Sequence, residues 1–200
     1  MINKLLIKRV ELPECRRWEA LRYARCRREE NGDPLFERAI SEISAIAANT
    51  VVYRIVSVNI KCNNVVLGDL EVSSEKLSQV LDGCSYAVIF CATAGIGADR
   101  LIAKYSATSP SLAIYCDAVA SERVEALSDA FEDAILCDLG ADAELRPRFS
   151  PGYGDLPLDF QKDRFRALRP EKYIGLTLND SLMMSPSKSV SAIIGVRKKV

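Results

Sequence analysis

The first part of the chain alternates between strand-like and helix-like patterns of apolar residues. Leu5 to Leu12 has the apolar content of a short strand, and Pro13 opens an arginine-rich stretch that predicts a helix through about Glu30. β-Branched residues dominate Val51 to Ile60 and return after a polar turn in Val65 to Val72, which together predict a hairpin. We therefore expect a sheet to begin within the first seventy or so residues.

A second helix is predicted to start at Asp33 and to end near Ala48. Asp33 can accept a hydrogen bond as the N-cap, and Pro34 suits the first helical position. Four apolar residues follow at near-helical spacing: Leu35, Ala39, Ile43 and Ile46.

After Ser73 the pattern changes to alternating helices and strands, which indicates an α/β layer. The expected elements are a helix over Glu75 to Leu81, a strand over Tyr86 to Ala92, a helix over Ala98 to Tyr105, a strand over Leu112 to Cys116 and a helix over Ala118 to Asp133. The chain then becomes irregular from about Leu136, with a further helix over Leu158 to Leu168 and closing strands over Tyr173 to Leu178 and Val190 to Val196. Taken together, the pattern predicts a mixed sheet with helices packed against it.

Length and charge narrow the class of protein. The 200 residues, 48% of them hydrophobic, can bury one sizeable core, and we expect one domain over residues 1–200. The chain has 27 basic and 27 acidic residues, so it lacks the net positive charge that attracts nucleic acid or an anionic membrane. Its first residues are too quickly charged for a signal peptide, and we expect a cytoplasmic protein without a membrane segment.

The seven cysteines include no Cys-x-x-Cys pair and are expected to be free thiols. Cys84, Cys91 and Cys116 lie in or beside apolar runs, where cysteine usually behaves as a small core residue. The sequence thus predicts neither a metal site nor a catalytic thiol.

The absence of histidine excludes several chemistries. A Ser-His-Asp triad, a Cys-His pair and an imidazole base all require that residue. A corrinoid ligated by histidine is excluded as well, so any cobalamin chemistry must use a cofactor carried by another chain. We expect no catalytic side chain.

Two other patterns allow competing interpretations. Gly95 and Gly97 follow a predicted strand and open a helix, and Asp117 follows about twenty residues later, as in a nucleotide-binding fingerprint. The third glycine of that fingerprint is here Arg100, which favours the alternative of a tight strand-to-helix turn. The arginines of the first helix, interleaved with Trp18 and Tyr23, could dock an acidic partner or form a solvated face. These arginines are Arg16, Arg17, Arg22, Arg25, Arg27 and Arg28.

The strongest chemical signal is the turn from Arg148 to Tyr153. Pro151 fixes its own backbone angle and Gly152 permits one closed to other residues, so a stiff bend would hold Arg148 and Tyr153 at a set distance. The planar fork of arginine can bind a carboxylate through two parallel hydrogen bonds. The residues alone leave two interpretations open, an ion pair that fixes the loop and a site for a small anion.

The Arg-x-x-x-Gly-Tyr turn and the segments after it resemble the activation domain of cobalamin-dependent methionine synthase. The resemblance is specific from Arg148 to Gly195, including Ile174 to Pro186 and the pair Val190-Ser191, and it is looser from Ala87 to Glu132. It hardly extends to the first seventy residues, so we separate a divergent part, residues 1–72, from a family-like part, residues 73–200.

The resemblance implies a fold, a function and a set of ligand contacts. The fold that it implies is α+β, with a mixed, largely antiparallel twisted sheet flanked by helices, as in the methionine synthase activation domain. The resemblance also implies binding of S-adenosylmethionine and support of the reductive remethylation of cobalamin on a separate corrinoid methyltransferase, with a flavodoxin or ferredoxin as a possible electron donor. The site residues that it implies are Arg148, Ser150, Gly152, Tyr153 and, on a helix that begins near Ala118, Glu125; Asp33 is the candidate for an N-terminal acidic contact. The alternatives are a docking module that has lost the ligand and a nucleotide-binding enzyme that uses Gly95 and Gly97.

Overall fold

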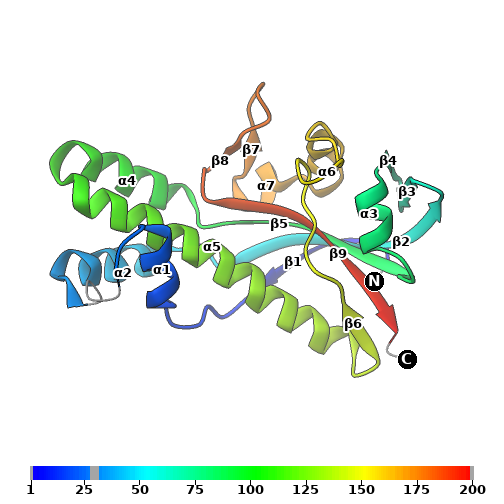
Figure 1. Ribbon diagram of the computed structural model, residues 1–200, viewed down its shortest axis with the longest axis horizontal. Coiled ribbons are helices and arrows are strands. Elements are labelled where there is room, and N and C mark those ends of the chain that lie inside the picture. Colours follow the sequence, from blue (N-terminus) through cyan, green and yellow to red (C-terminus); the bar gives the residue numbers. More distant parts are fainter. Residues whose placement is uncertain (1, 28–31, 199–200) are drawn as a thin grey trace.

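The computed structural model describes residues 2–27 and 32–198, in which seven helices and nine strands are found (Figure 1). The strands are β1 (Leu5–Arg9), β2 (Thr50–Lys61), β3 (Asn64–Leu67), β4 (Leu70–Ser73), β5 (Tyr86–Thr93), β6 (Ala143–Leu145), β7 (Thr177–Leu178), β8 (Met184–Ser185) and β9 (Ser189–Lys198). The helices are α1 (Arg17–Tyr23), α2 (Pro34–Ile46), α3 (Glu75–Val80), α4 (Ile96–Thr108), α5 (Pro110–Leu139), α6 (Phe160–Leu168) and α7 (Pro170–Ile174).

Seven strands form one sheet in the order β4-β3-β2-β5-β9-β6, with β1 paired to β2. Every ladder in this sheet is antiparallel, and β7 and β8 form a separate two-stranded hairpin. Helices flank the sheet on both faces (Figure 1). The predicted α+β fold with a largely antiparallel sheet is therefore confirmed.

The two central strands, β5 and β9, are apolar because both of their faces are covered. Ile89 and Ile193 pack on the side that carries α6 and α7, where Leu168 belongs to the same cluster. Phe90 and Ile194 face the other way and pack in a cluster with Phe131 of α5. A strand buried on both faces has a nearly continuous apolar sequence, which is why these two strands could be predicted.

The predicted strand over Leu112 to Cys116 is wrong, because this segment is the start of the 30-residue helix α5. Pro110 occupies the first turn, where a proline suits a helix. Leu112 and Cys116 are buried one turn apart, while Ile114 between them is 54% exposed. The spacing is helical, but the short run of apolar residues imitated a strand.

Three other boundaries differ from prediction. The first helix ends at Tyr23, before the positive φ of 57° at Arg25; Arg28, Glu29 and Glu30, predicted to continue it, lie outside the described residues. The predicted strand over Val65 to Val72 is two strands separated by a turn at Gly68, whose φ is 65°. Most of the predicted strand over Tyr173 to Leu178 is instead the end of α7 and a Gly175 cap.

A buried arginine fixes α6 to the central strands. Arg164 is fully buried, and its guanidinium donates hydrogen bonds to the carbonyl oxygens of Ser191, Phe90 and Ala192 at 3.3, 3.2 and 2.7 Å. Burial lowers its pKa to about 10, so it remains protonated at neutral pH. This contact sets the position of α6 over β5 and β9.

Among the helices that the structure describes, none combines the length and the apolar content that crossing a membrane requires.

The packing around Gly195 of β9 leaves no room for a side chain, so a substitution at this position tests that packing. A Cβ atom at this position would lie 2.7 Å from Cys84 Sγ and 2.9 Å from Leu81 Cδ2. We predict that Gly195→Ala lowers the free energy of unfolding by about 1–3 kcal/mol, measured by urea unfolding. Adding Cys84→Ala should recover part of the loss, whereas a change in Gly195→Ala below about 0.5 kcal/mol would contradict the packing.

Candidate functional site

The backbone of residues 146–149 lies along the edge of β9 beyond β6. Arg146 N donates to Gly195 O at 2.8 Å, and Phe149 exchanges two hydrogen bonds with Ile193, at 2.9 and 2.8 Å. These bonds continue the β6–β9 pairing toward the start of β9. They fix the backbone on both sides of Arg148.

The next residues form a tight turn that leaves the strand edge. Gly152 has a φ of 90°, a conformation that favours glycine, and its N–H donates to Leu156 O at 2.9 Å. Tyr153 N donates to Ser150 O at 3.2 Å, and the Tyr153 side chain is 68% exposed. The stiff bend predicted for this sequence is present.

Asp155 ties this turn to the start of α3. Its carboxylate accepts hydrogen bonds from Ser74 Oγ at 2.6 Å and from the backbone N–H groups of Glu75 and Lys76 at 2.6 and 3.1 Å. The Ser74 hydroxyl, followed by the two backbone N–H groups, lowers the pKa of Asp155. The turn is thus held at a helix N-terminus as well as at β9.

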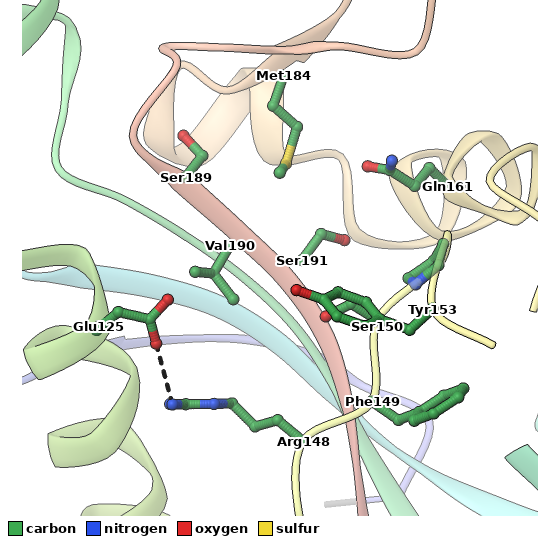
Figure 2. A pocket seen from close by; sticks show the side chains of 11 residues that line it. Glu125, Arg148, Phe149, Ser150, Tyr153, Gln161, Met184, Ser189, Val190 and Ser191 are labelled. Atoms are coloured by element: carbon green, nitrogen blue, oxygen red, sulfur yellow. Dashed lines mark hydrogen bonds and ion pairs between the residues drawn. The ribbon is translucent and has the colours of Figure 1, made fainter. Parts of the chain in front are cut away.

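A cavity of about 480 Å³ opens beside the turn (Figure 2). Of the five predicted site residues, Arg148, Ser150, Tyr153 and Glu125 line it, and Gly152 shapes the turn without lining it. The other lining residues are Phe149, Pro151, Gln161, Met184, Ser189, Val190 and Ser191. The structure therefore brings together side chains from the turn, α5, α6, β8 and β9.

Arg148 lies among three carboxylates of α5. Its Nη2 is 3.1 Å from Glu125 Oε2 and 2.9 Å from Asp129 Oδ1, and its Nη1 is 3.1 Å from Glu132 Oε1. Only the Glu125 contact has hydrogen-bond geometry, and Nη1 is buried without a hydrogen-bond partner in the described part of the chain. The ion-pair interpretation of Arg148 is correct for this structure, and Nη1 is paired with Glu132 without making a hydrogen bond to the described residues.

The acidic cluster has a surplus of negative charge. Burial raises the pKa of Glu132, the positive charge of Arg148 lowers it, and neighbouring carboxylates such as Asp129 raise it further. Arg16 adds a second cation, with its Nη1 at 2.7 Å from Asp129 Oδ2. Sequence analysis missed Asp129 and Glu132, although their i+4 and i+7 spacing from Glu125 places all three on one face of a helix.

Two predicted roles do not fit this geometry. Asp33 is not among the residues that line the cavity; it caps α2, accepting from Leu35 N at 2.7 Å and from Tyr115 Oη at 3.2 Å. The prediction of Asp33 as an acidic ligand contact is therefore wrong for this cavity. Only its role as a helix N-cap is confirmed.

The nucleotide-binding interpretation of Gly95, Gly97 and Asp117 is also wrong. Asp117 lies within helix α5, not at the end of a strand, and pairs with Lys188 at 2.8 Å. A Cβ atom on Gly97 would lie 3.2 Å from Ile46 Cδ1, so the loop packs closely against the end of α2. The glycines serve a tight strand-to-helix turn.

The arginines near α1 mostly serve internal contacts. Arg16 pairs with Glu122 and Asp129, Arg17 with Glu37 and Arg22 with Glu19. These pairs favour a solvated, structural face over a dedicated docking surface. The exposed ring of Trp18 is the main apolar feature that α1 presents.

The cysteines and acidic residues supply neither a disulfide nor a metal centre. All seven cysteines are free, and Cys84, Cys91 and Cys116 are buried as predicted. Burial raises the pKa of Cys116 to about 11, and burial with the nearby Glu122 raises that of Cys15 to about 12, so both thiols stay protonated at neutral pH. Within the described ranges, no group of three acidic or cysteine residues is arranged to hold a metal ion.

Comparisons with known proteins point to one family. The family model described as vitamin B12 dependent methionine synthase, activation domain, matches residues 63–200. A crystal structure described as the MetH reactivation domain bound to AdoHcy matches 96% of this chain and 78% of that chain, with a TM-score of 0.70 and 16% sequence identity. No curated protein matches the chain. All residues that line the cavity lie within the matched span.

The Asp155 cap predicts an acid-sensitive step in stability. Because its folded-state pKa is lowered, the ionised carboxylate stabilises the fold above the ordinary value of 3.8, and this contribution is lost as pH falls through the folded-state value. We expect Asp155→Asn to be less stable than the wild type at neutral pH and to lose less stability on acidification. Urea unfolding between neutral pH and about pH 3 measures both effects.

The matched control for this experiment is Asp142→Asn at an exposed position after α5. This variant should have the stability of the wild type at neutral pH, and it should lose about as much stability as the wild type on acidification. If Asp155→Asn behaved like this control, the cap would not stabilise the turn.

Proposed function

Because the chain belongs to the vitamin B12 dependent methionine synthase activation domain family, we propose that it binds S-adenosylmethionine in the cavity beside Arg148 and supports the reductive remethylation of cobalamin on a separate corrinoid methyltransferase. The observation that carries this proposal is the convergence of Arg148, Ser150, Tyr153 and Glu125 on one cavity. Glu125 of α5 lies 23 residues before Arg148 in the sequence, and the fold brings it to the turn that carries the other three residues.

The charge of the site suits this ligand. S-adenosylmethionine carries a carboxylate, an ammonium and a sulfonium, so it is a net cation with one anionic group. Arg148 is the candidate for the carboxylate, because its buried Nη1 has no hydrogen-bond partner in the described structure. Glu125 and the carboxylates beside it would favour the cationic groups.

Binding would change the partners of Arg148. The carboxylate of the ligand would have to share or replace contacts that Arg148 makes with the carboxylates of α5. An α5 carboxylate displaced from Arg148 would then lie near a positive charge of the ligand. Gly152 lets the turn approach the ligand closely, and the exposed Tyr153 ring can pack over it. Ser150 offers a hydroxyl on the same wall.

The chain need only bind and orient its ligand. Cobalamin on the partner supplies the nucleophile and the sulfonium supplies the methyl group, so no histidine or other base is required. The partner is accordingly a corrinoid protein of the methionine synthase type, and a flavodoxin or ferredoxin would supply electrons. In this proposal the cofactors supply the reacting groups, and the protein holds them in the required orientation.

We also propose that residues 1–200 form one domain. Strands β1 to β4 of the divergent part, residues 1–72, join β5 and β9 of the family-like part, residues 73–200, in the same sheet. Helices α1 and α2 share an apolar cluster with α4 and α5. A boundary between the two parts would have to break this sheet.

The first test is calorimetric titration of S-adenosylmethionine into the protein and its variants. Loss of a charge-assisted pair of this kind costs roughly 2–5 kcal/mol, so we expect Arg148→Ala to bind at least tenfold more weakly. Tyr153→Ala should also weaken binding, and because this ring is exposed its loss should leave the fold intact. Thermal unfolding of each variant checks that loss of Arg148 from the acidic cluster does not unfold the protein.

Arg146→Ala is the matched control, since Arg146 lies two residues away and its Nε donates to Val80 O outside the cavity. It should bind as the wild type does. Absence of binding to the folded wild type would contradict the proposal and favour a docking module without a ligand.

The second test follows the methyl group. A cobalamin-dependent methionine synthase lacking its own activation domain is reduced and incubated with S-adenosylmethionine labelled in the methyl group. We expect label on the cobalamin only when this chain is added, and at least tenfold less with Arg148→Ala. Equal labelling with and without the chain would exclude the reactivating role even if the ligand binds.

A further inference from the structure

The side chain of Gln161 has a buried acceptor that the protein does not use. Gln161 lines the cavity beside Arg148 and is only 6% exposed, yet its Oε1 accepts no hydrogen bond from the described residues. Buried side-chain acceptors are nearly always paired, because an unpaired one loses its hydration without compensation. In the wall of a cavity, such an atom is available to a donor on a bound molecule.

The position of this side chain is fixed by its helix. Gln161 lies in the first turn of α6, where its backbone N–H donates to Leu158 O at 3.0 Å. One turn later Arg164 is bonded to carbonyl oxygens of β5 and β9. The Gln161 amide is therefore presented to the cavity from a helix that is anchored on the sheet.

Gln161 and Arg148 enter the cavity from opposite walls. In Figure 2, Glu125 and Arg148 lie together on the α5 side, and Gln161 and Met184 lie on the side of α6 and β8. The thioether of Met184 provides a polarisable apolar surface, which suits contact with a flat aromatic ring. The cavity thus has a charged end and a neutral end, where the Gln161 amide and serine hydroxyls lie beside an apolar surface.

We propose that Gln161 recognises the base of the ligand, with Oε1 accepting a hydrogen bond from the exocyclic amine of adenine. This inference rests on the proposed function, in which the charged groups of S-adenosylmethionine occupy the end near Arg148 and Glu125. The adenine ring then lies at the Met184 end, where its exocyclic amine is the N–H donor of a flat aromatic base whose ring nitrogens are acceptors. Gln161 would make the site selective for adenosyl ligands over analogues without that amine.

A purely structural role for Gln161 makes a different prediction. Arg164 Nε, one turn away on α6, also has no hydrogen-bond partner within the described ranges, so a reoriented Gln161 could serve that atom. In that case a variant without the amide would lose stability and would bind all ligands equally less well. Discrimination between ligands separates the two roles.

The experiment compares two ligands, S-adenosylhomocysteine and its analogue in which hydrogen replaces the 6-amino group of the purine. Affinities are measured by calorimetry for the wild type, for Gln161→Met, which keeps the length but removes the acceptor, and for Gln79→Met, an exposed control on α3. We expect removal of the amine to weaken binding about tenfold in the wild type and in Gln79→Met, and less than about twofold in Gln161→Met.

The outcomes distinguish this inference from the proposed function. Suppose that S-adenosylhomocysteine binds, but that removal of the amine weakens binding by the same factor in the wild type and in Gln161→Met. The ligand site is then supported, and the role of Gln161 is wrong. If the wild type does not distinguish the two ligands, Gln161 does not recognise the amine. If neither ligand binds the folded wild type, this inference fails, whereas the proposed function fails only if S-adenosylmethionine does not bind either.

Discussion

Two backbone hydrogen bonds between Phe149 and Ile193 determine the position of the candidate site. They hold residues 146–149 on the edge of β9, so the neighbouring Arg148 faces the carboxylates of α5 and the following turn leaves the sheet beside Ser191. The burial of β9 between α5 and α6 makes this edge rigid. The cavity is therefore a consequence of strand pairing, and the loop residues around it depend on the core.

In the proposed function, Arg148 serves both structure and binding. Without a ligand it neutralises part of an acidic helix face formed by Glu125, Asp129 and Glu132. Its fork also keeps one buried donor free of hydrogen bonds within the described structure. A ligand that brings one carboxylate and two positive charges can use that donor and leave the helix face compensated, whereas a simple anion would add charge to an already acidic site.

The sequence predicted most of the sheet, because β5 and the middle of β9 are nearly continuous apolar runs. It also predicted the turn, because Pro151 fixes its own φ and Gly152 permits a positive φ that other residues avoid. It failed at Leu112 to Cys116, where a five-residue apolar run in a helix imitates a strand. It identified Arg148 through the Arg-x-x-x-Gly-Tyr turn, and Glu125 through the resemblance to the activation domain family. It could not find Gln161 or Met184, because their approach to the cavity depends on the packing of α6 and the β7–β8 hairpin, and no local pattern records that packing.

Ligand binding at Arg148 is tested most directly by a crystal structure of the protein with S-adenosylhomocysteine. We expect the ligand in the cavity between Arg148 and Gln161, with its carboxylate on the Arg148 guanidinium and at least one α5 carboxylate displaced from it. A ligand bound elsewhere, or one in this cavity that leaves the contacts of Arg148 with α5 unchanged, would contradict the assignment of Arg148 as the carboxylate-binding residue.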